Sequence, residues 1–203
     1  MVYASSAAVY GSLASPQRIG FEQPENPYGF SKYIMDNIAR NYAKENVDRS
    51  ILGLRYFNAY GANEFFKGNT ASMIIQLGHQ ILSGKPPRLF AGSNELFRDF
   101  INVDDVVQAN IKASVSQRSG VYNVGTGVAR SFQEVADLLQ KEFQTNLGTE
   151  FFENPYLDYQ RHTQADISST IKDLNYKPLI SLEDGIKNYA SEIILTYNKF
   201  THA

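Results

Sequence analysis

The chain has 203 residues, of which 43% are hydrophobic and 13% aromatic, enough for one sizeable core and a small second lobe. Its 19 basic and 21 acidic residues give a net charge of -2, so we expect no broad attraction to nucleic acid or to a membrane. The chain has no cysteine, and its three histidines have no metal-ligand spacing. It shows no export signal and no run of about 18 apolar residues. We therefore expect a cytoplasmic enzyme without a metal.

Strands and helices are predicted in alternation along the chain. Short apolar runs bounded by turn residues predict strands, and apolar residues at helical spacing predict helices. In chain order, the first predicted elements are a strand at 2–6, a helix at 28–45, a strand at 51–57, a helix at 71–82, and short strands at 89–90 and 99–102. A helix at 104–115, a strand at 121–124 and helices at 131–143 and 182–197 follow. This order indicates an α/β fold with a mainly parallel sheet.

The first predicted helix has a clear start and a regular apolar pattern. The Asn-Pro pair at 26–27 is typical of the first positions of a helix. Ile34, Ile38 and Tyr42 recur at four-residue spacing, which places them on one side of the helix. We expect these three side chains to form a buried stripe.

Tyr28 and Lys32 are candidates for acid/base chemistry on this helix. Side chains four residues apart share a helical face, so an ammonium at the second position favours the phenolate form of a tyrosine at the first. An ordinary tyrosine, with a pKa of about 10, is only about 0.1% ionised at pH 7. With 13 tyrosines in the chain, however, one such pair is expected about once by chance. The pair needs support from other residues.

That support comes from Ser5 and Ser6 at the end of the first predicted strand. A hydroxyl at the carboxyl end of a parallel strand points into the ligand crevice of a doubly wound sheet. With the Tyr-x-x-x-Lys pair downstream, the sequence resembles the extended short-chain dehydrogenase/reductase family along nearly its whole length. The resemblance implies that Ser6 orients the substrate hydroxyl, Tyr28 transfers the proton, and Lys32 also holds the nicotinamide ribose. A capping or packing role is the alternative for Ser6.

Two further motifs resemble family members that act on nucleotide-activated sugars. They are RYFNAYG at 55–61 and RDFINVDDV at 98–106. In those members the residue matching Asn58 hydrogen-bonds the substrate, and the residue matching Arg98 meets its pyrophosphate, for which a planar guanidinium is well suited. A structural ion pair between Arg98 and Asp99 is the alternative. The Gly-Thr-Gly turn at 125–127 is interpreted as structural.

The residues after Ser6 favour epimerisation over dehydration, because Ala7 and Ala8 stand where the family's dehydratases carry an acidic pair. Segments 66–72, 89–93 and 159–166 resemble members that epimerise an ADP-linked heptose at its sixth carbon, a step toward the lipopolysaccharide core. In these members a tyrosine and a lysine act on opposite orientations of the exocyclic carbon. The matching residues here are Tyr28 and Lys67, although Lys67 alone would be interpreted as a solvated surface lysine.

The resemblance also implies binding residues for a nucleotide sugar and a nicotinamide cofactor. The cofactor would be NADP, with NAD as the alternative, and its predicted contacts are Lys32, Ala59 and Lys67. Asn69 and Gln76 depart from the pattern, which has a small hydroxyl residue and a histidine there, and Ala62-Asn63 replaces Pro-Arg. Aromatic residues of the set have core packing as an alternative. The predicted substrate-binding residues are Ser6, Asn58, Asn69, Gln76, Phe90, Ala91, Gly92, Ser93, Arg98 and Tyr159.

The glycine-rich phosphate turn expected of this family after its first strand has no counterpart in the sequence. We therefore expect the C-terminal portion of a Rossmann-like doubly wound sheet plus a smaller α/β substrate-binding lobe, with this chain alone incomplete and inactive. The predicted division is 1–68 with 99–145, and 69–98 with 146–203. A homo-oligomer is also expected. The alternatives are a UDP- or dTDP-sugar 4-epimerase and a non-catalytic nucleotide-sugar-binding fragment.

Overall fold

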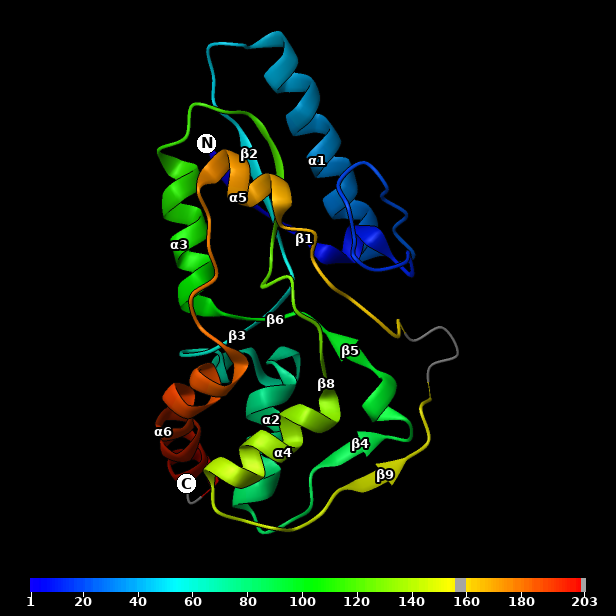
Figure 1. The fold of residues 1–203 in the computed structure, drawn as a ribbon, viewed down its shortest axis with the longest axis vertical. Helices are drawn as coiled ribbons and strands as arrows, with labels where there is room; N and C mark the ends of the chain where they lie inside the picture. Colours follow the sequence, from blue (N-terminus) through cyan, green and yellow to red (C-terminus); the bar gives the residue numbers. More distant parts are fainter. Residues whose placement is uncertain (156–159, 202–203) are drawn as a thin grey trace.

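The computed structural model describes residues 1–155 and 160–201 and contains a three-stranded parallel sheet (Figure 1). The strands are β1 (Val2–Ser6), β2 (Leu52–Tyr56) and β7 (Gly120–Val124), in the order β1-β2-β7. Ser6 lies opposite Tyr56, which lies opposite Val124, so the carboxyl ends of all three strands meet at one edge. The predicted strands at 2–6, 51–57 and 121–124 are thus confirmed.

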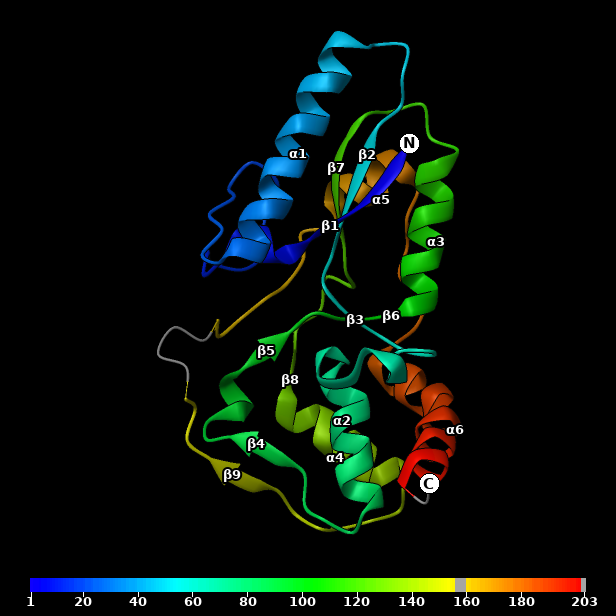
Figure 2. The same cartoon turned by 180° about the vertical axis from the view of Figure 1, so that it is seen from behind.

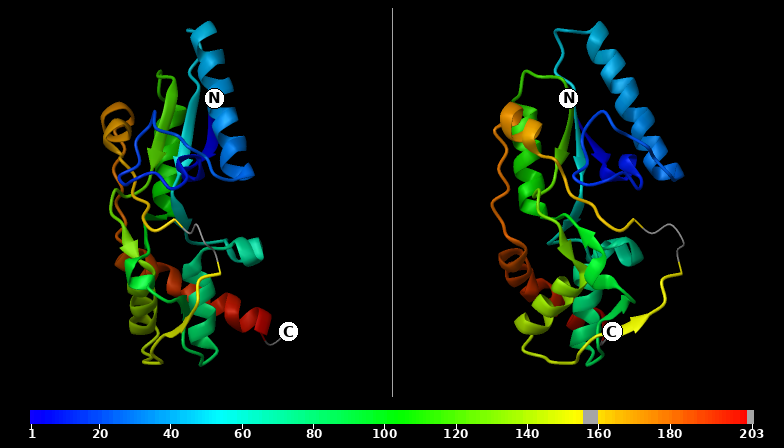
Figure 3. Two further views of the ribbon diagram at one scale, coloured as in Figure 1. Left: turned by 90° about the vertical axis from the view of Figure 1, so that its right-hand side faces the viewer. Right: turned by 45° about the vertical axis from the view of Figure 1, so that its right-hand side comes forward.

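Helices cover both faces of this sheet, as the left view of Figure 3 shows. Helix α1 (Pro27–Glu45) lies on one face, and α3 (Val103–Ser114) with α5 (Ser168–Leu174) lies on the other. Leu52 and Leu54 of β2 belong to the apolar core on the α3 side. A parallel sheet with helices on both faces is the Rossmann-like α/β fold that the alternating pattern predicted.

A second group of helices forms its own core below the sheet in Figure 2. It consists of α2 (Met73–Leu82), α4 (Phe132–Glu142) and α6 (Leu182–Thr201), whose apolar faces meet around residues such as Leu77 and Leu139. The helices were predicted close to these bounds. Four short strands lie beside them: β4 (Arg88–Phe90) pairs in parallel with β9 (Glu150–Phe152), and β5 (Phe97–Arg98) pairs antiparallel with β8 (Arg130–Ser131).

The chain passes between the two groups through β3 (Asn58–Tyr60) and β6 (Phe100–Asn102), which pair in parallel. The predicted division into two lobes stays a prediction. In the structure α4, which that division places with the sheet, packs against α2 and α6, and α5 packs against β7.

The predicted burial of the apolar stripe on α1 is wrong. Ile34, Ile38 and Tyr42 are 39%, 65% and 52% exposed. The face that packs on the sheet instead carries Gly29 and Asp36, which are buried. Successive residues of a helix are about 100° apart, so Ile34 and Ile38, each two positions from Asp36, lie about 160° around the helix from it, nearly opposite the packed face.

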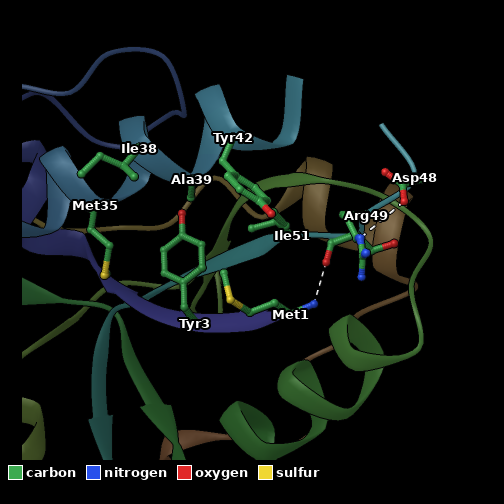
Figure 4. A pocket seen from close by; sticks show the side chains of 10 residues that line it. Met1, Tyr3, Met35, Ile38, Ala39, Tyr42, Asp48, Arg49 and Ile51 are labelled. Atoms are coloured by element: carbon green, nitrogen blue, oxygen red, sulfur yellow. Dashed lines mark hydrogen bonds and ion pairs between the residues drawn. The ribbon is translucent and has the colours of Figure 1, made fainter. Parts of the chain in front are cut away.

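The exposed stripe borders a groove of about 640 Å³ between α1 and β1 (Figure 4). Ile38 and Tyr42 line it from the helix, Tyr3 lines it from β1, and Met1 and Ile51 line it from the positions directly before β1 and β2. Its walls are therefore mostly apolar, and β1 is the outer strand of the described sheet on this side.

Candidate functional site

The first turn of α1 is held against the carboxyl end of β1. The Asn26 side chain accepts a hydrogen bond from the Gly29 N–H at 2.8 Å, which caps the helix. A Cβ atom on Gly29 would lie 2.4 Å from the carbonyl oxygen of Ala8, in the short helix η1 (Ala7–Tyr10) that follows β1. Only glycine allows this approach. It brings Tyr28, the neighbouring residue, to the edge where the strands end.

Lys32 connects the candidate tyrosine to β1. Its Nζ atom donates a hydrogen bond to the carbonyl oxygen of Ala4 at 3.0 Å. The same atom lies 5.8 Å from the centre of the Tyr28 ring, whose side chain is 57% exposed. The pair thus has the shared face that the four-residue spacing predicted, with the phenol open to a ligand.

Ser6 caps η1 in this structure. Its Oγ atom accepts a hydrogen bond from the Ala8 N–H at 3.2 Å, so the capping alternative describes a contact that is present. Accepting this bond leaves the hydroxyl proton available to a ligand. Ser6 also lies opposite Tyr56, two residues before Asn58, whose side chain is exposed and whose N–H binds the Asp99 carbonyl oxygen at 3.0 Å. The segments that carry Ser6, Tyr28 and Asn58 therefore all reach this edge of the sheet.

Arg98 is 6% exposed and lies at the border of the two cores. Its Nη1 and Nη2 atoms donate to the carbonyl oxygens of Phe97 and Gln160 at 2.8 and 2.5 Å. Its guanidinium carbon lies 5.4 Å from the centre of the Phe132 ring. These contacts set the plane of the guanidinium beside the strand that carries it.

The Asp99 carboxylate binds the turn after β7. It accepts hydrogen bonds from the N–H and hydroxyl of Thr126, from the N–H of Gly127 and from the N–H of Ala165. Burial raises the pKa of Asp99 by more than these hydrogen bonds lower it. The contacts support the structural interpretation of the 125–127 turn.

Two residues predicted to contact the cofactor lie in one pocket of about 120 Å³. Ala59 lines it from β3, and Lys67 lines it from η2 (Phe65–Thr70). Lys67 is exposed, and within the described parts of the chain its ammonium group has no hydrogen-bond or ion-pair partner. The pocket places a free cation near the strand that begins at Asn58.

A second pocket, of about 200 Å³, is lined by two of the predicted substrate-binding residues in segment 90–93. Phe90 and Ser93 line it together with Phe132, whose ring contacts Arg98. Ser93 is 1% exposed, and its Oγ atom has no hydrogen-bond partner among residues 1–155 and 160–201. A buried hydroxyl without a partner is costly unless a ligand or water binds it. Ala91 and Gly92 lie in the exposed turn between Phe90 and Ser93.

Three predicted substrate-binding residues remain: Gln76, Asn69 and Tyr159. The Gln76 amide donates to the carbonyl oxygens of Ala71 and Asn69, at 2.7 and 3.4 Å. Asn69 itself is exposed on η2. Tyr159 lies outside the described residues.

A sequence profile described as the NAD dependent epimerase/dehydratase family matches residues 1–125, which is more than half of the chain. The chain belongs to the NAD-dependent epimerase/dehydratase family. The matched region includes β1, Tyr28, Lys32, Asn58, Lys67 and Arg98. It ends at Gly125, so Gln160, whose carbonyl oxygen accepts from Arg98, lies outside it.

Two individual relatives are at least 40% identical to this chain. An ADP-L-glycero-D-manno-heptose-6-epimerase of Brachyspira hyodysenteriae is 40% identical over 94% of this chain and 62% of its own length. The crystal structure of the Helicobacter pylori ADP-L-glycero-D-manno-heptose-6-epimerase is 44% identical, with a TM-score of 0.88 over 95% of this chain and 59% of that one. This chain therefore spans about three fifths of the length of these relatives.

A more distant solved structure contains a bound cofactor. The UDP-glucuronic acid 4-epimerase of Bacillus cereus, solved with UDP-glucuronic acid and NAD, is 26% identical, with a TM-score of 0.83. The match covers 97% of this chain and 62% of that one. The family's description itself names a nicotinamide nucleotide, NAD. Two places in this chain have residue types suited to hold one: Lys32 beside the Tyr28 ring, and the pocket lined by both Ala59 and Lys67.

Sequence reasoning missed a buried charged cluster beneath α1. Arg55, whose side chain is fully buried, donates to Asp36 at 2.9 Å and to the Tyr10 hydroxyl at 2.9 Å, and its Nη1 lies 2.7 Å from Glu22. The Tyr10 hydroxyl donates in turn to Asn123 of β7 at 2.6 Å. Arg55 opens the RYFNAYG motif, but its partners are 19 to 45 residues away in sequence. No local pattern connects them.

Glu22 makes the stability of this cluster depend on pH. Burial alone raises its pKa, but the charge of Arg55 and the hydrogen bond from Arg40 lower the pKa further, to about 2. A carboxyl with a depressed folded-state pKa stabilises the fold above its unfolded pKa of about 4.5 and stops doing so as the pH falls toward 2. Between pH 5 and pH 2, the free energy of unfolding should therefore decrease less in Glu22→Gln than in the unchanged protein. Urea unfolding over this pH range measures the difference. Glu25→Gln, on the same loop, should leave the loss unchanged; an equal effect of both would contradict the assignment.

Proposed function

We propose that the protein converts ADP-D-glycero-D-manno-heptose to ADP-L-glycero-D-manno-heptose, a step in building the lipopolysaccharide core. The observation that carries this proposal is the difference in identity: 40% and 44% with two ADP-heptose 6-epimerases, against 26% with a UDP-sugar 4-epimerase of similar fold. Ala7 and Ala8 also favour epimerisation over dehydration, because the family's dehydratases have an acidic pair at these positions.

The chemistry requires hydride and proton to leave the sixth carbon and its oxygen, and then to return with the opposite configuration. A bound nicotinamide supplies a reversible hydride acceptor. Lys32 and the pocket of Ala59 and Lys67 would hold it, and NADP is the proposed form. Tyr28 would take the proton from the hydroxyl in one orientation, and Lys67 would transfer it in the other. Arg98 would bind the pyrophosphate, and the Ser93 hydroxyl would contact the sugar.

The free ammonium of Lys67 supports a second acid/base group. Replacing it with methionine removes the proton-transferring nitrogen and keeps a side chain of similar length. We expect kcat for heptose epimerisation to fall about 100-fold, with KM nearly unchanged, in a steady-state assay. Lys85→Met, an exposed lysine after α2, is the matched control and should retain full activity. Full activity in Lys67→Met would remove the two-base assignment.

The direct test uses the whole protein that carries this sequence, supplied with NADP and ADP-D-glycero-D-manno-heptose. Proton NMR should show inversion at the sixth carbon. Parallel incubations with UDP-glucose and dTDP-glucose test the 4-epimerase alternative, and inversion at the fourth carbon there without heptose turnover would overturn the proposal. Binding of ADP-heptose by calorimetry without turnover of any sugar would instead support a non-catalytic nucleotide-sugar-binding role.

Two predictions about cellular context stay predictions. In the part of the chain that the structure describes, no helix combines the length and apolar character needed to cross a bilayer. A cytoplasmic location agrees with a substrate and a cofactor that are both small soluble nucleotides. Homo-oligomer formation is tested by light scattering of the purified protein.

A further inference from the structure

Glu64 is a buried carboxylate at the base of the loop that carries Lys67. It is 4% exposed and immediately precedes η2. Its Oε2 atom accepts a hydrogen bond from the Ser72 N–H at 2.7 Å, and its Oε1 atom accepts one from the Ser72 hydroxyl at 2.7 Å. Oε1 also accepts a longer bond, of 3.4 Å, from the Gly61 N–H. One side chain thus binds both ends of segment 61–72.

The backbone of Glu64 binds the lysine-bearing turn directly. Its carbonyl oxygen accepts a hydrogen bond from the Lys67 N–H at 2.9 Å. The turn is irregular, because Gly68 has a left-handed φ of 56° in the middle of η2. The Thr70 hydroxyl then donates to the Lys67 carbonyl oxygen at 2.8 Å. Such a turn has few regular helical hydrogen bonds, so its shape depends on what holds its two ends.

No cation neutralises the Glu64 carboxylate among the residues that the structure describes, since none of the ion pairs there includes it. Burial of the Tyr189 phenol, which faces Glu64 from α6, raises the pKa of Tyr189, and the negative charges of Glu64 and Glu192 raise this pKa further. Glu192, also on α6, accepts a separate hydrogen bond from the Asn63 N–H at 2.6 Å. The carboxylate is therefore held by N–H and O–H donors of the loop. Without these donors it would be a buried negative charge lacking hydrogen bonds, which is energetically unfavourable.

We propose that Glu64 is a positioning residue for Lys67: by binding Gly61 and Ser72 it closes the loop and holds the lysine at its pocket beside Ala59. Glu64 also lines this pocket, but its carboxylate oxygens bind the loop donors of Gly61 and Ser72. The proposal rests on the proposed function for the role of Lys67, but the loop geometry that it invokes can be measured without any substrate.

The first test is limited proteolysis of the bond after Lys67 by trypsin. In Glu64→Gln the side chain keeps one oxygen, but its amide nitrogen cannot accept from Ser72 or Gly61, so at least one loop hydrogen bond is lost. Cleavage after Lys67 should become roughly tenfold faster. Ser72→Ala, which removes only the hydroxyl, should give a smaller rise. Glu142→Gln, an exposed charge-matched control at the end of α4, should give none.

The bond after Arg55, whose side chain is fully buried in β2, becomes accessible to trypsin only when the fold opens, so it reports global opening in the same digest. Its cleavage rate should not change in any variant. Equal acceleration after Lys67 and after Arg55 would overturn the proposal, because Glu64 would then stabilise the fold in general. Unchanged cleavage after Lys67 would overturn it as well.

The second test measures whether Glu64 acts through Lys67. In the whole protein with NADP and ADP-heptose, Glu64→Gln should lower kcat roughly tenfold with little change in KM. In a Lys67→Met background the same substitution should have almost no further effect. Equal losses in both backgrounds would overturn the positioning role. If no sugar is turned over by any variant, the proposed function fails, while the proteolysis result still decides the loop geometry.

Discussion

Replacing Tyr28 with phenylalanine is expected to lower kcat by about 10²–10⁴-fold while leaving nucleotide-sugar binding nearly unchanged. The substitution removes one oxygen from a ring that is already 57% exposed, so the packing of α1 should be unaffected. The loss follows from removing the proton-transferring hydroxyl beside the Lys32 ammonium, 5.8 Å from the ring centre. Steady-state kinetics and calorimetry with ADP-heptose separate turnover from binding.

The matched control for this prediction is Tyr42→Phe. Tyr42 lies on the same helix with a similar exposure of 52%, but it lines the groove beside β1 and has no lysine facing its ring among the described cation-aromatic contacts. Its loss should leave kcat unchanged. If both variants lose activity equally, Tyr28 acts through helix packing and not through proton transfer.

Replacing Asp36 with asparagine is expected to cost about 3–5 kcal/mol of unfolding free energy. Asp36 and Arg55 are both fully buried, and Asp36 Oδ2 accepts from the Arg55 Nε at 2.9 Å. In the variant the buried Arg55 guanidinium loses one of its anionic partners. The side-chain amide nitrogen that replaces Oδ2 cannot accept the hydrogen bond from Arg55 Nε. The Tyr3 hydroxyl, 3.0 Å from Oδ1, also loses a charged acceptor. Urea unfolding at pH 7 measures the difference.

Asp48→Asn is the control for this buried pair. Asp48 forms an ion pair of 3.4 Å with Arg49, but both side chains are at least 70% exposed. Water and salt screen such a pair, so its loss should change the unfolding free energy by no more than about 0.5 kcal/mol. Comparable costs for the two variants would show that burial does not set the contribution of the Asp36 pair.

Local patterns were sufficient for the elements that hold the site. Four of these elements, α1, β2, α4 and α6, are present in the structure. Each was predicted from residues close together in the sequence: the Asn-Pro start of α1, the apolar run of β2, and the apolar spacing of α4 and α6. The short pairs β3–β6 and β5–β8 were not all foreseen, because two- or three-residue strands carry too little periodicity to be recognised.

The site was predictable only in part. The Tyr28 and Lys32 side chains share a helical face because of their spacing, and the structure shows the contact. The joining of Phe90, Ser93 and Phe132 in one pocket depends on the pairing of β5 with β8, which no local pattern specifies.

The sequence by itself determined the α/β alternation, the helix that carries Tyr28 and Lys32, and the motifs that indicate a nucleotide-sugar enzyme, because these depend on residue order and local spacing. Only the tertiary structure decided which face of α1 packs inward. The buried Arg55 attracts Asp36 to the sheet, since a buried charge needs a partner, and this turns Ile34 and Ile38 outward. It likewise decided that Glu64 binds both ends of the Lys67 loop, a contact set by folding and not by sequence distance.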